Sequence, residues 1–342
     1  MEQAVNTLFG MHILNEAADR FSLTKGSYKK LGDFENYVYE VEREGQSYVM
    51  RFTHSSHRSE LDVLAELDWI SYLVQVGVDI PQVYTSRLGK MTEVIHAGDS
   101  YFTASLFQKA EGHMPDYANP AEWNEHLFAS WGEITGRMHK ATQSYTPSIH
   151  HKRMTWEDDE LLVNAKSYVL PGDEYVLERL NEVMTHLHSL PQGQDVYGLI
   201  HTDIHSRNFF VDNGRISVFD FDDCAYNWFI HDIAIPLYYA LSWGVPERYA
   251  GNREAFAADF VQAFWSGYEK VMPLSRQWLQ ELSTFLKLRD ITLYLVIHKK
   301  EDLQLATPRL IQWVNDIKER IRQNIAIVEI DFDLCRFDSS AG

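Results

Sequence analysis

Hydrophobic and polar residues in the early part of the chain alternate in short runs, as they do in half-buried strands. Residues 37–41 (Tyr-Val-Tyr-Glu-Val) and 47–52 (Ser-Tyr-Val-Met-Arg-Phe) predict two strands joined by a turn at Glu44-Gly45. Further short strands are predicted at 82–87, 91–96 and 101–107. The pattern therefore predicts a small antiparallel sheet.

Two helices are predicted to accompany this sheet. Apolar residues spaced for one helix face run through residues 1–20. Ser59 suits the N-cap of a second helix, whose leucine-rich stripe continues to stop signals at Gly77 and Pro81. Residues 1–107 are therefore expected to form an N-terminal lobe, with a leading helix, an antiparallel sheet and one inserted helix.

The rest of the chain has a mainly helical period. Residues 108–120 contain two prolines and a glycine, and we interpret them as a hinge or linker. Residues 121–342 are expected to form a C-terminal lobe, with helices predicted at 121–141, 175–190, 230–241, 253–271, 277–298 and 308–327. The fold class predicted is α+β, with two lobes, the larger of them mainly helical.

A hairpin pattern interrupts the helical part at residues 198–223. Apolar runs at 209–211 and 216–219 flank Asp212-Asn213-Gly214, and Asn and Gly favour the positive φ angles of tight turns. An antiparallel hairpin returns the chain to the end at which it began. Asn208 and Asp220 are therefore expected at the same end of the hairpin.

Composition limits the classes of protein that fit. The chain has 342 residues, 45% of them hydrophobic, which is typical of a globular protein. Its net charge of −18 argues against a nucleic-acid partner. It has no apolar run of about 18 residues for a membrane helix and no signal-peptide pattern at its start. With Cys224 and Cys335 as the only cysteines, we expect a cytoplasmic protein. The sequence does not indicate an oligomeric state.

The polar residues at the ends of the hairpin suit a magnesium site. Carboxylate and amide oxygens are the ligands that Mg²⁺ prefers, usually with substrate phosphates completing its shell. The spacing His201-x-Asp203-x-x-x-x-Asn208 is that of the catalytic loop in protein kinases, with an aspartate base and a metal-binding asparagine. Asp220-Phe221 then stands where such enzymes place the metal-binding Asp of Asp-Phe-Gly. The two matches, in this order, indicate phosphoryl transfer.

The stretches 201–208 (His-Thr-Asp-Ile-His-Ser-Arg-Asn) and 218–222 (Val-Phe-Asp-Phe-Asp) closely resemble the aminoglycoside phosphotransferase and choline kinase family, which has a protein-kinase-like fold. They also resemble its homoserine kinase type II and stress-response kinase branches. Weaker likeness extends across most of the chain, for example at 35–39, 49–51, 77–81 and 231–234. The resemblance implies an ATP- and Mg²⁺-dependent kinase.

The resemblance also implies roles for the hairpin residues. Asp203 would accept or orient the proton of the substrate hydroxyl. Asn208 and Asp220 would hold Mg²⁺ on the ATP phosphates, and Asp222 would reach a second metal ion or the substrate. Asp222 replaces the usual Gly of Asp-Phe-Gly, a departure from the protein-kinase pattern.

Nucleotide contacts are implied in the first lobe. Arg51 stands where protein kinases carry a lysine, and arginine can also contact phosphates and pair with a helix carboxylate. Glu66 is the expected partner, with Glu60 as the alternative. The hinge is expected near Leu106, Phe107 and Gln108, whose backbone would bind adenine.

Three further residues are expected to support the loop. His201 is interpreted as a structural brace, His205 as either a brace or an exposed side chain, and Asp232 as a helix cap or a tie for the loop. Asp232 follows Asp223 too closely for a long activation loop. This argues for a small-molecule kinase over a regulated protein kinase.

The acceptors compatible with this interpretation are amino alcohols, homoserine-like and choline-like compounds and sugars. One alternative is a protein Ser/Thr kinase of the stress-response type. A second is a metallohydrolase that uses His201, Asp203 and His205 on a transition metal, although a catalytic zinc site needs three convergent ligands and an open position. An inactive ATP-binding module is the remaining class, and the presence of Asp203, Asn208 and Asp220 argues against it.

Overall fold

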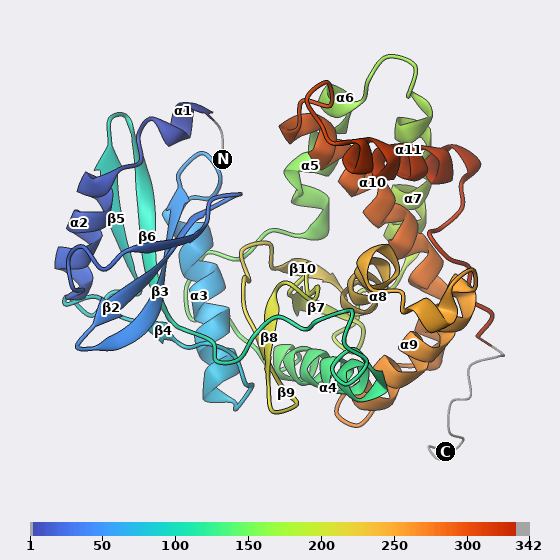
Figure 1. Ribbon diagram of the computed structural model, residues 1–342, viewed down its shortest axis with the longest axis horizontal. Coiled ribbons are helices and arrows are strands. Elements are labelled where there is room, and N and C mark those ends of the chain that lie inside the picture. The colour runs from blue at the N-terminus through green and yellow to red at the C-terminus, as the bar shows by residue number, and fades with distance from the viewer. Residues whose placement is uncertain (1–2, 333–342) are drawn as a thin grey trace. The chain divides into compact units, whose positions relative to one another are not determined.

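The computed structural model describes residues 3–332, and Figure 1 follows them along the chain. The residues fall into two compact units. The first comprises the chain up to His113 together with Ser144–Arg153 and Ser217–Asp222. The second comprises Met114–Gln143, Met154–Ile216 and the chain from Asp223 onwards. Two short segments therefore return to the first unit after the chain has left it at His113, inside the stretch 108–120.

The first unit is built on an antiparallel sheet of strand order β1-β2-β3-β6-β4, in which β5 also pairs with β6. The strands are β1 (Lys29–Gly32), β2 (Tyr37–Arg43), β3 (Gln46–His54), β4 (Val83–Tyr84), β5 (Thr92–Ala97) and β6 (Ser100–Gln108). The helices are α1 (Gln3–Asn6), α2 (Met11–Phe21) and α3 (Glu60–Gln75). The single helix predicted over residues 1–20 is wrong, because the chain is extended at Gly10 and α2 starts after it.

The sheet has one apolar and one polar face, because side chains alternate along each strand. α2 and the strands bury a hydrophobic cluster that includes Phe21, Met50 and Phe102. The intervening positions of β3 and β6 are buried and polar: Arg51, Thr53, Thr103 and Ser105. The sheet therefore presents a buried polar surface on the face that carries Arg51.

α3 begins at a capping box. The Ser59 hydroxyl accepts a hydrogen bond from the Asp62 N–H (3.2 Å), and the Asp62 carboxylate accepts one from the Ser59 N–H (3.0 Å). These bonds satisfy main-chain donors that a helix start leaves unpaired. The predicted N-cap at Ser59 is therefore confirmed.

The second unit is mainly helical. Its helices are α4 (Glu125–Thr142), α5 (Glu160–Val163), α6 (Ala165–Tyr168), α7 (Tyr175–Ser189), α8 (His231–Trp243), α9 (Arg253–Tyr268), α10 (Leu282–Lys300) and α11 (Pro308–Gln323), with 3₁₀ turns η1 (Trp156–Asp158), η2 (Glu247–Tyr249) and η3 (Arg276–Glu281). The helix predicted from residue 121 begins later, because Asn124 caps it by accepting from the N–H groups of His126 and Leu127. The helix predicted at 277–298 is η3 followed by α10.

α4 and α9 lie side by side (Figure 1) and approach closely at two glycines. A Cβ atom on Gly132 would lie 1.8 Å from the main-chain oxygen of Phe264, and one on Gly267 would lie 1.8 Å from that of Ala129. A side chain at either position would push the helices apart. The glycines therefore set the position of α4, which carries a residue of the candidate site.

Two small sheets hold the central motif. β7 (Tyr197–Ile200) pairs with β10 (Ala225–Trp228), and β8 (Phe209–Asp212) pairs with β9 (Arg215–Val218). The predicted turn joins β8 to β9, with Asn213 and Gly214 at φ angles of 49° and 80°. The predicted catalytic loop thus connects β7 to β8. β10 occupies most of the interval between Asp223 and α8, where a protein kinase would need its activation loop.

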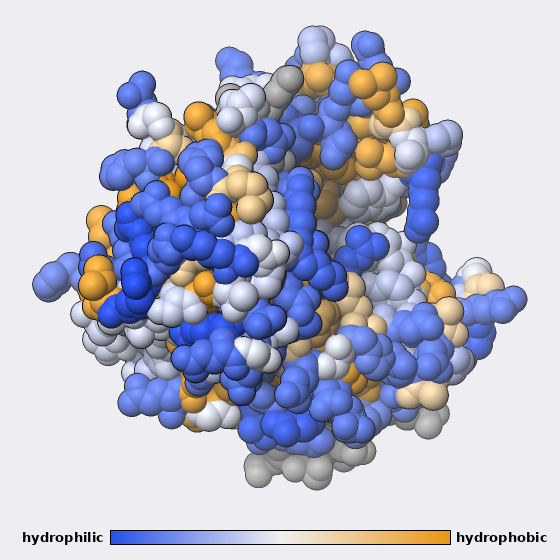
Figure 2. Space-filling view, turned by 60° about the vertical axis from the view of Figure 1, so that its left-hand side comes forward, coloured by the Kyte–Doolittle hydropathy of each residue, from blue (hydrophilic) through white to orange (hydrophobic). Residues whose placement is uncertain are grey.

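Hydrophilic residues predominate on the molecular face that Figure 2 shows, in a chain with 49 acidic and 31 basic residues. Among residues 3–332, no helix is both long and apolar enough to cross a membrane. Cys224 is buried, and Cys335 lies outside the described residues.

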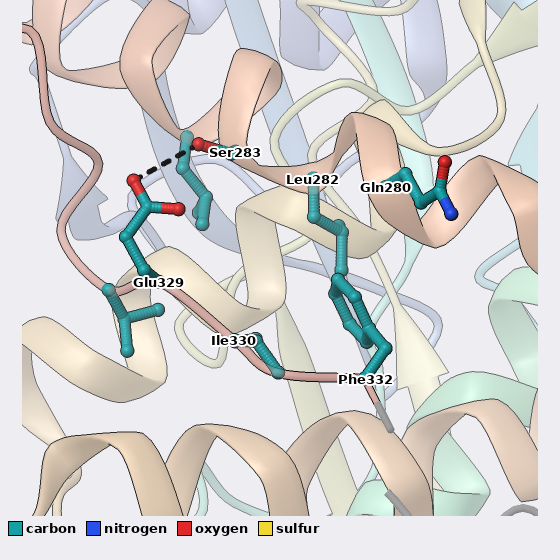
Figure 3. A pocket seen from close by; sticks show the side chains of 8 residues that line it. Gln280, Leu282, Ser283, Glu329, Ile330 and Phe332 are labelled. Atoms are coloured by element: carbon teal, nitrogen blue, oxygen red, sulfur yellow. Dashed lines mark hydrogen bonds between the residues drawn. The ribbon is translucent and has the colours of Figure 1, made fainter. Parts of the chain in front are cut away.

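A pocket of about 240 Å³ opens in the second unit (Figure 3). Its lining comes from the end of η3, the start of α10 and the chain at 328–332, with a hydrogen bond of 3.3 Å between Ser283 and Glu329. The pocket contains none of the site residues predicted from the sequence.

Candidate active site

Asp203 is held on several sides within the second unit. Its Oδ1 accepts a hydrogen bond of 2.7 Å from Nη2 of Arg289. Its Oδ2 lies 3.3 Å from Nε2 of His205 and 3.3 Å from Nδ2 of Asn208. The Asn208 amide also donates to the Asp203 main-chain oxygen at 2.9 Å. The loop therefore brings Asp203, His205 and Asn208 together and adds Arg289 from α10.

These neighbours determine the charge of Asp203. Burial by itself would raise the pKa of the carboxyl group, but the neighbouring His205 and Arg289 outweigh burial and hold that pKa well below its ordinary value. Asp203 is therefore ionised at neutral pH and is a weak base. Such a carboxylate can accept a hydrogen bond from a hydroxyl group and orient it, which is what phosphoryl transfer requires of this position.

Asp232 ties down the first residues of the loop. Its buried carboxylate accepts hydrogen bonds from the N–H groups of His201 (2.9 Å) and Thr202 (2.7 Å). A third contact, at 3.2 Å, joins it to Nε2 of His139 on α4, whose Nδ1 pairs with the Tyr268 hydroxyl at 2.8 Å. Thr202 has a φ angle of 68°, a conformation that costs energy for a residue with a side chain. The two bonds from Asp232 stabilise the loop where its backbone is strained.

His201 and His205 occupy different environments. His201 is fully buried, and its Nδ1 accepts a hydrogen bond of 3.3 Å from the Asp203 N–H. His205 is partly exposed, with its ring 4.8 Å from that of Tyr239 and 5.8 Å from that of Trp243.

The Arg289 guanidinium that contacts Asp203 would compete with a transition metal for the Asp203 carboxylate. The geometry therefore does not favour the metallohydrolase alternative.

In the first unit, Arg51 and Glu66 form a buried ion pair. Nη1 and Nη2 of Arg51, on β3, donate to the two carboxylate oxygens of Glu66, on α3, across 2.8 and 2.6 Å. Arg51 pairs with Glu66 rather than with Glu60, whose carboxylate accepts from Thr92 at 2.9 Å. Burial would lower the pKa of Arg51, but Glu66 outweighs it and raises that pKa, with smaller contributions from Asp222 and Asp220.

Asp220 and Asp222 belong to the same unit as this pair. Asp222 Oδ2 lies 2.6 Å from Nε2 of His57, and its main-chain oxygen accepts from Arg153 at 2.5 Å. Burial would raise the pKa of Asp222, but His57, Arg51 and further basic neighbours keep it far below its ordinary value. Asp220 has a φ angle of 66°, in the left-handed region.

The residues present fit a divalent cation. Asp222 Oδ1 is buried and makes no hydrogen bond within residues 3–332, so one carboxylate oxygen is left for another ligand. A buried oxygen without a hydrogen-bond partner costs desolvation free energy, and a bound cation would offset that cost by accepting the oxygen as a ligand. Within the first unit, Asp220 and Asp222 carry carboxylate oxygens of the kind that Mg²⁺ prefers.

Leu106 and Phe107 lie inside the sheet rather than at its end. Both residues of β6 stand in register with β3 on one side and with β4 on the other, and the Gln108 N–H donates to the Gln82 main-chain oxygen at 2.9 Å. β6 therefore ends at Gln108, just after Leu106 and Phe107, which are predicted to contact adenine.

Sequence reasoning missed Arg289, Tyr239 and His139, because no short motif marks them. For Arg289, the sequence pattern of α10 does contain an indication. It lies three residues after Leu286 and four before Leu293, both buried on α10, so a charged residue interrupts an apolar helical stripe. Such an interruption predicts a buried polar partner, although the sequence cannot say which one.

The chain resembles known phosphotransferases over most of its length. It matches the sequence model of the family described as "Phosphotransferase enzyme family" at residues 28–274. An amicoumacin kinase of Bacillus subtilis (strain 168) is 34% identical over 322 residues, 94% of each chain. A solved amicoumacin kinase in complex with AMP-PNP, Ca²⁺ and Ami is also 34% identical, with a TM-score of 0.91 over 97% of this chain and 99% of that one. A microcompartment-associated aminopropanol kinase, 20% identical, has the same fold, with a TM-score of 0.75 over 93% and 100% of the two chains.

These similarities confirm the predicted resemblance, the predicted α+β kinase-like fold and the prediction of a kinase. AMP-PNP is an ATP analogue, and its presence with a divalent cation in the amicoumacin kinase agrees with the predicted ATP and Mg²⁺. The amicoumacin kinase also agrees with the predicted transfer to a small molecule.

Proposed function

This chain belongs to the phosphotransferase enzyme family, and from that premise we propose that it transfers the γ-phosphoryl group of ATP to a hydroxyl group of an amicoumacin-like small molecule. The observation that carries the proposal is the 34% identity with an amicoumacin kinase over 94% of both chains. The ionised Asp203, held in a rigid cluster, is the chemical feature that supports it.

Asp203 is the group that meets the acceptor. Its carboxylate accepts a hydrogen bond from the acceptor hydroxyl and points the oxygen lone pair towards the γ-phosphorus. The acceptor oxygen bonds to that phosphorus, the bond to the oxygen bridging to the β-phosphate breaks, and ADP leaves with the electron pair. The hydroxyl proton passes to Asp203 or through it to water. A weak base suffices, because the proton becomes acidic only as the new bond forms.

Other residues hold the nucleotide. Arg51, kept in place by Glu66, would contact phosphate oxygens, and Asn208, Asp220 and Asp222 would hold Mg²⁺, which would neutralise phosphate charge. The adenine contact was predicted at Leu106 and Phe107. The register of β6 favours main-chain groups just beyond Gln108.

The acceptor class is inferred from the relatives and from the side chains near Asp203. The rings of His205, Tyr239 and Trp243 gather beside the base, with Tyr239 and Trp243 4.4 Å apart. An aromatic wall of this kind suits an acceptor with a flat or apolar part next to its hydroxyl group. Homoserine, simple amino alcohols, choline and sugars are smaller or more polar, and we rank them below an amicoumacin-like acceptor.

An acceptor panel tests the proposal. ATP consumption is measured with Mg²⁺ and with amicoumacin, 1-amino-2-propanol, homoserine, choline or an aminoglycoside, and the phosphate ester is identified by phosphorus NMR. We expect the highest kcat/KM for amicoumacin and no transfer in Asp203→Asn. A higher kcat/KM for a simple amino alcohol would refute the acceptor assignment, and absence of transfer to every acceptor would refute the function.

A further inference from the structure

A partly buried arginine that the proposed chemistry does not use contacts the base. Arg289, on α10, donates from Nη2 to Asp203 Oδ1 across 2.7 Å and also to the Tyr239 hydroxyl. Its guanidinium lies over the Tyr239 ring, 5.0 Å from the centroid. The side chains of Arg289 and Asp203 are only 19% and 22% exposed. The contact is therefore anchored by a second residue and shielded from most of the solvent.

This contact fixes one carboxylate oxygen and leaves the other for the acceptor. Within residues 3–332, Oδ2 has two polar neighbours at 3.3 Å, His205 and Asn208, which are longer and weaker contacts than that of Arg289. An acceptor hydroxyl must approach the carboxylate to within about 3 Å. Because Arg289 holds Oδ1, the carboxylate cannot turn freely about its axis. The direction in which Oδ2 points is then determined by α10, which lies far from the motif in sequence.

We propose that Arg289 is a positioning residue for the acceptor, which orients Asp203 so that its second carboxylate oxygen meets the acceptor hydroxyl. The inference rests on the function proposed above. Both the charge and the shape of the side chain matter. The planar guanidinium reaches the carboxylate and the Tyr239 hydroxyl together, whereas a lysine would keep the charge and hold the carboxylate less rigidly.

The chain contains a matched network that serves as a control. Arg320, on α11, donates to the Asp290 carboxylate across 2.8 and 2.6 Å and to the Tyr238 hydroxyl across 3.3 Å. Its side chain is 14% exposed, close to the exposure of Arg289. The network has the same three residue types and includes none of the predicted site residues. Equivalent substitutions at the two arginines therefore separate positioning of Asp203 from general stability.

The experiment measures kcat and KM for acceptor and for ATP, with urea unfolding, in Arg289→Lys, Arg289→Met, Arg320→Lys and Arg320→Met. A misplacement of a catalytic group by about 1 Å can cost about 100-fold, so we expect about that loss of acceptor kcat/KM in Arg289→Met. Arg289→Lys should recover part of the loss. KM for ATP should stay unchanged in both. The Arg320 variants should be less stable and retain the wild-type kcat/KM.

Two results would overturn the inference while leaving the proposed function intact. One is a folded Arg289→Met protein with wild-type acceptor kcat/KM. The other is a loss of activity at both arginines that simply follows the loss of stability. If Arg289→Met does not fold, Tyr239→Phe removes the second anchor and should still lower acceptor kcat/KM, and an unchanged value would count against the inference. A wild-type protein that transfers phosphate to no acceptor would instead overturn the proposed function, and the inference with it.

Discussion

The Arg51–Glu66 pair allows a test that separates a structural role from a catalytic one. The side chains are 6% and 0% exposed, and two hydrogen bonds of 2.6 and 2.8 Å join them. Removing one partner of a buried ion pair leaves the other charge uncompensated, at a cost of about 3–5 kcal/mol. Replacing both partners by apolar side chains of similar size is often close to neutral.

The structure predicts that the two single substitutions are unequal. In Glu66→Gln, Arg51 keeps the attraction of Asp220 and Asp222, so the loss should lie near the lower end, about 3 kcal/mol. In Arg51→Met, Glu66 loses the only side-chain partner that it has within residues 3–332, and the loss should lie near the upper end, about 5 kcal/mol. The double variant Arg51→Met/Glu66→Leu should recover most of the stability of the wild-type protein.

Urea unfolding of the four proteins gives the stabilities, and ATP turnover gives the activities. If Arg51 contacts ATP phosphates, the double variant should recover stability and still have a raised KM for ATP. Recovery of both would refute the nucleotide-binding role and leave the pair with a structural one. A loss below about 1 kcal/mol in Arg51→Met would show that the argument from burial is wrong, because that is the value of an exposed ion pair.

Three further predictions follow from the same structure. Asp203→Asn should lower kcat about 10²- to 10⁴-fold while Mg²⁺–ATP at about 100 times its Kd still adds about 2.7 kcal/mol of stability in thermal unfolding. Loss of that shift would mean that the substitution damages nucleotide binding. Gly132→Ala and Gly267→Ala should each destabilise the protein by at least about 1–3 kcal/mol, although alanine is the better helix former, and an unchanged melting temperature would contradict the close approach of α4 and α9. Burial would raise the pKa of Asp62, but bonds from Ser59 and His151 leave it lowered. Its contribution to stability is therefore complete above the ordinary carboxyl pKa and is lost as the pH falls below it, so the melting temperature of Asp62→Asn should fall less on acidification than that of the wild-type protein.

The parts of the molecule that sequence reasoning predicted well are those with local causes. The turn at Asn213-Gly214 depends on two residues that tolerate positive φ, and the start of α3 depends on the side chain of Ser59. The spacing of Asp203 and Asn208 fixes a loop whose contacts lie within a few residues. Each of these features can be read from neighbouring positions in the chain.

The parts that could not be predicted depend on contacts between distant residues. Arg289 meets Asp203 across 86 positions, and His139 meets Asp232 across 93. Neither contact has a spacing that a sequence pattern could reveal.

The basic residues around the acidic residues explain why the motif residues alone are insufficient for catalysis. A triphosphate repels carboxylates, and both the triphosphate and a chain with a net charge of −18 favour protonation of those acids. Each acid of the candidate site with a lowered pKa has a basic partner in its own unit: Asp203 has Arg289, Asp222 has His57, and Asp232 has His139. These partners keep the carboxylates ionised and oriented before any nucleotide binds, and fixed charges need not reorganise during the reaction. In a reaction that depends mainly on positioning, the residues that hold the motif should therefore affect kcat almost as strongly as the motif itself.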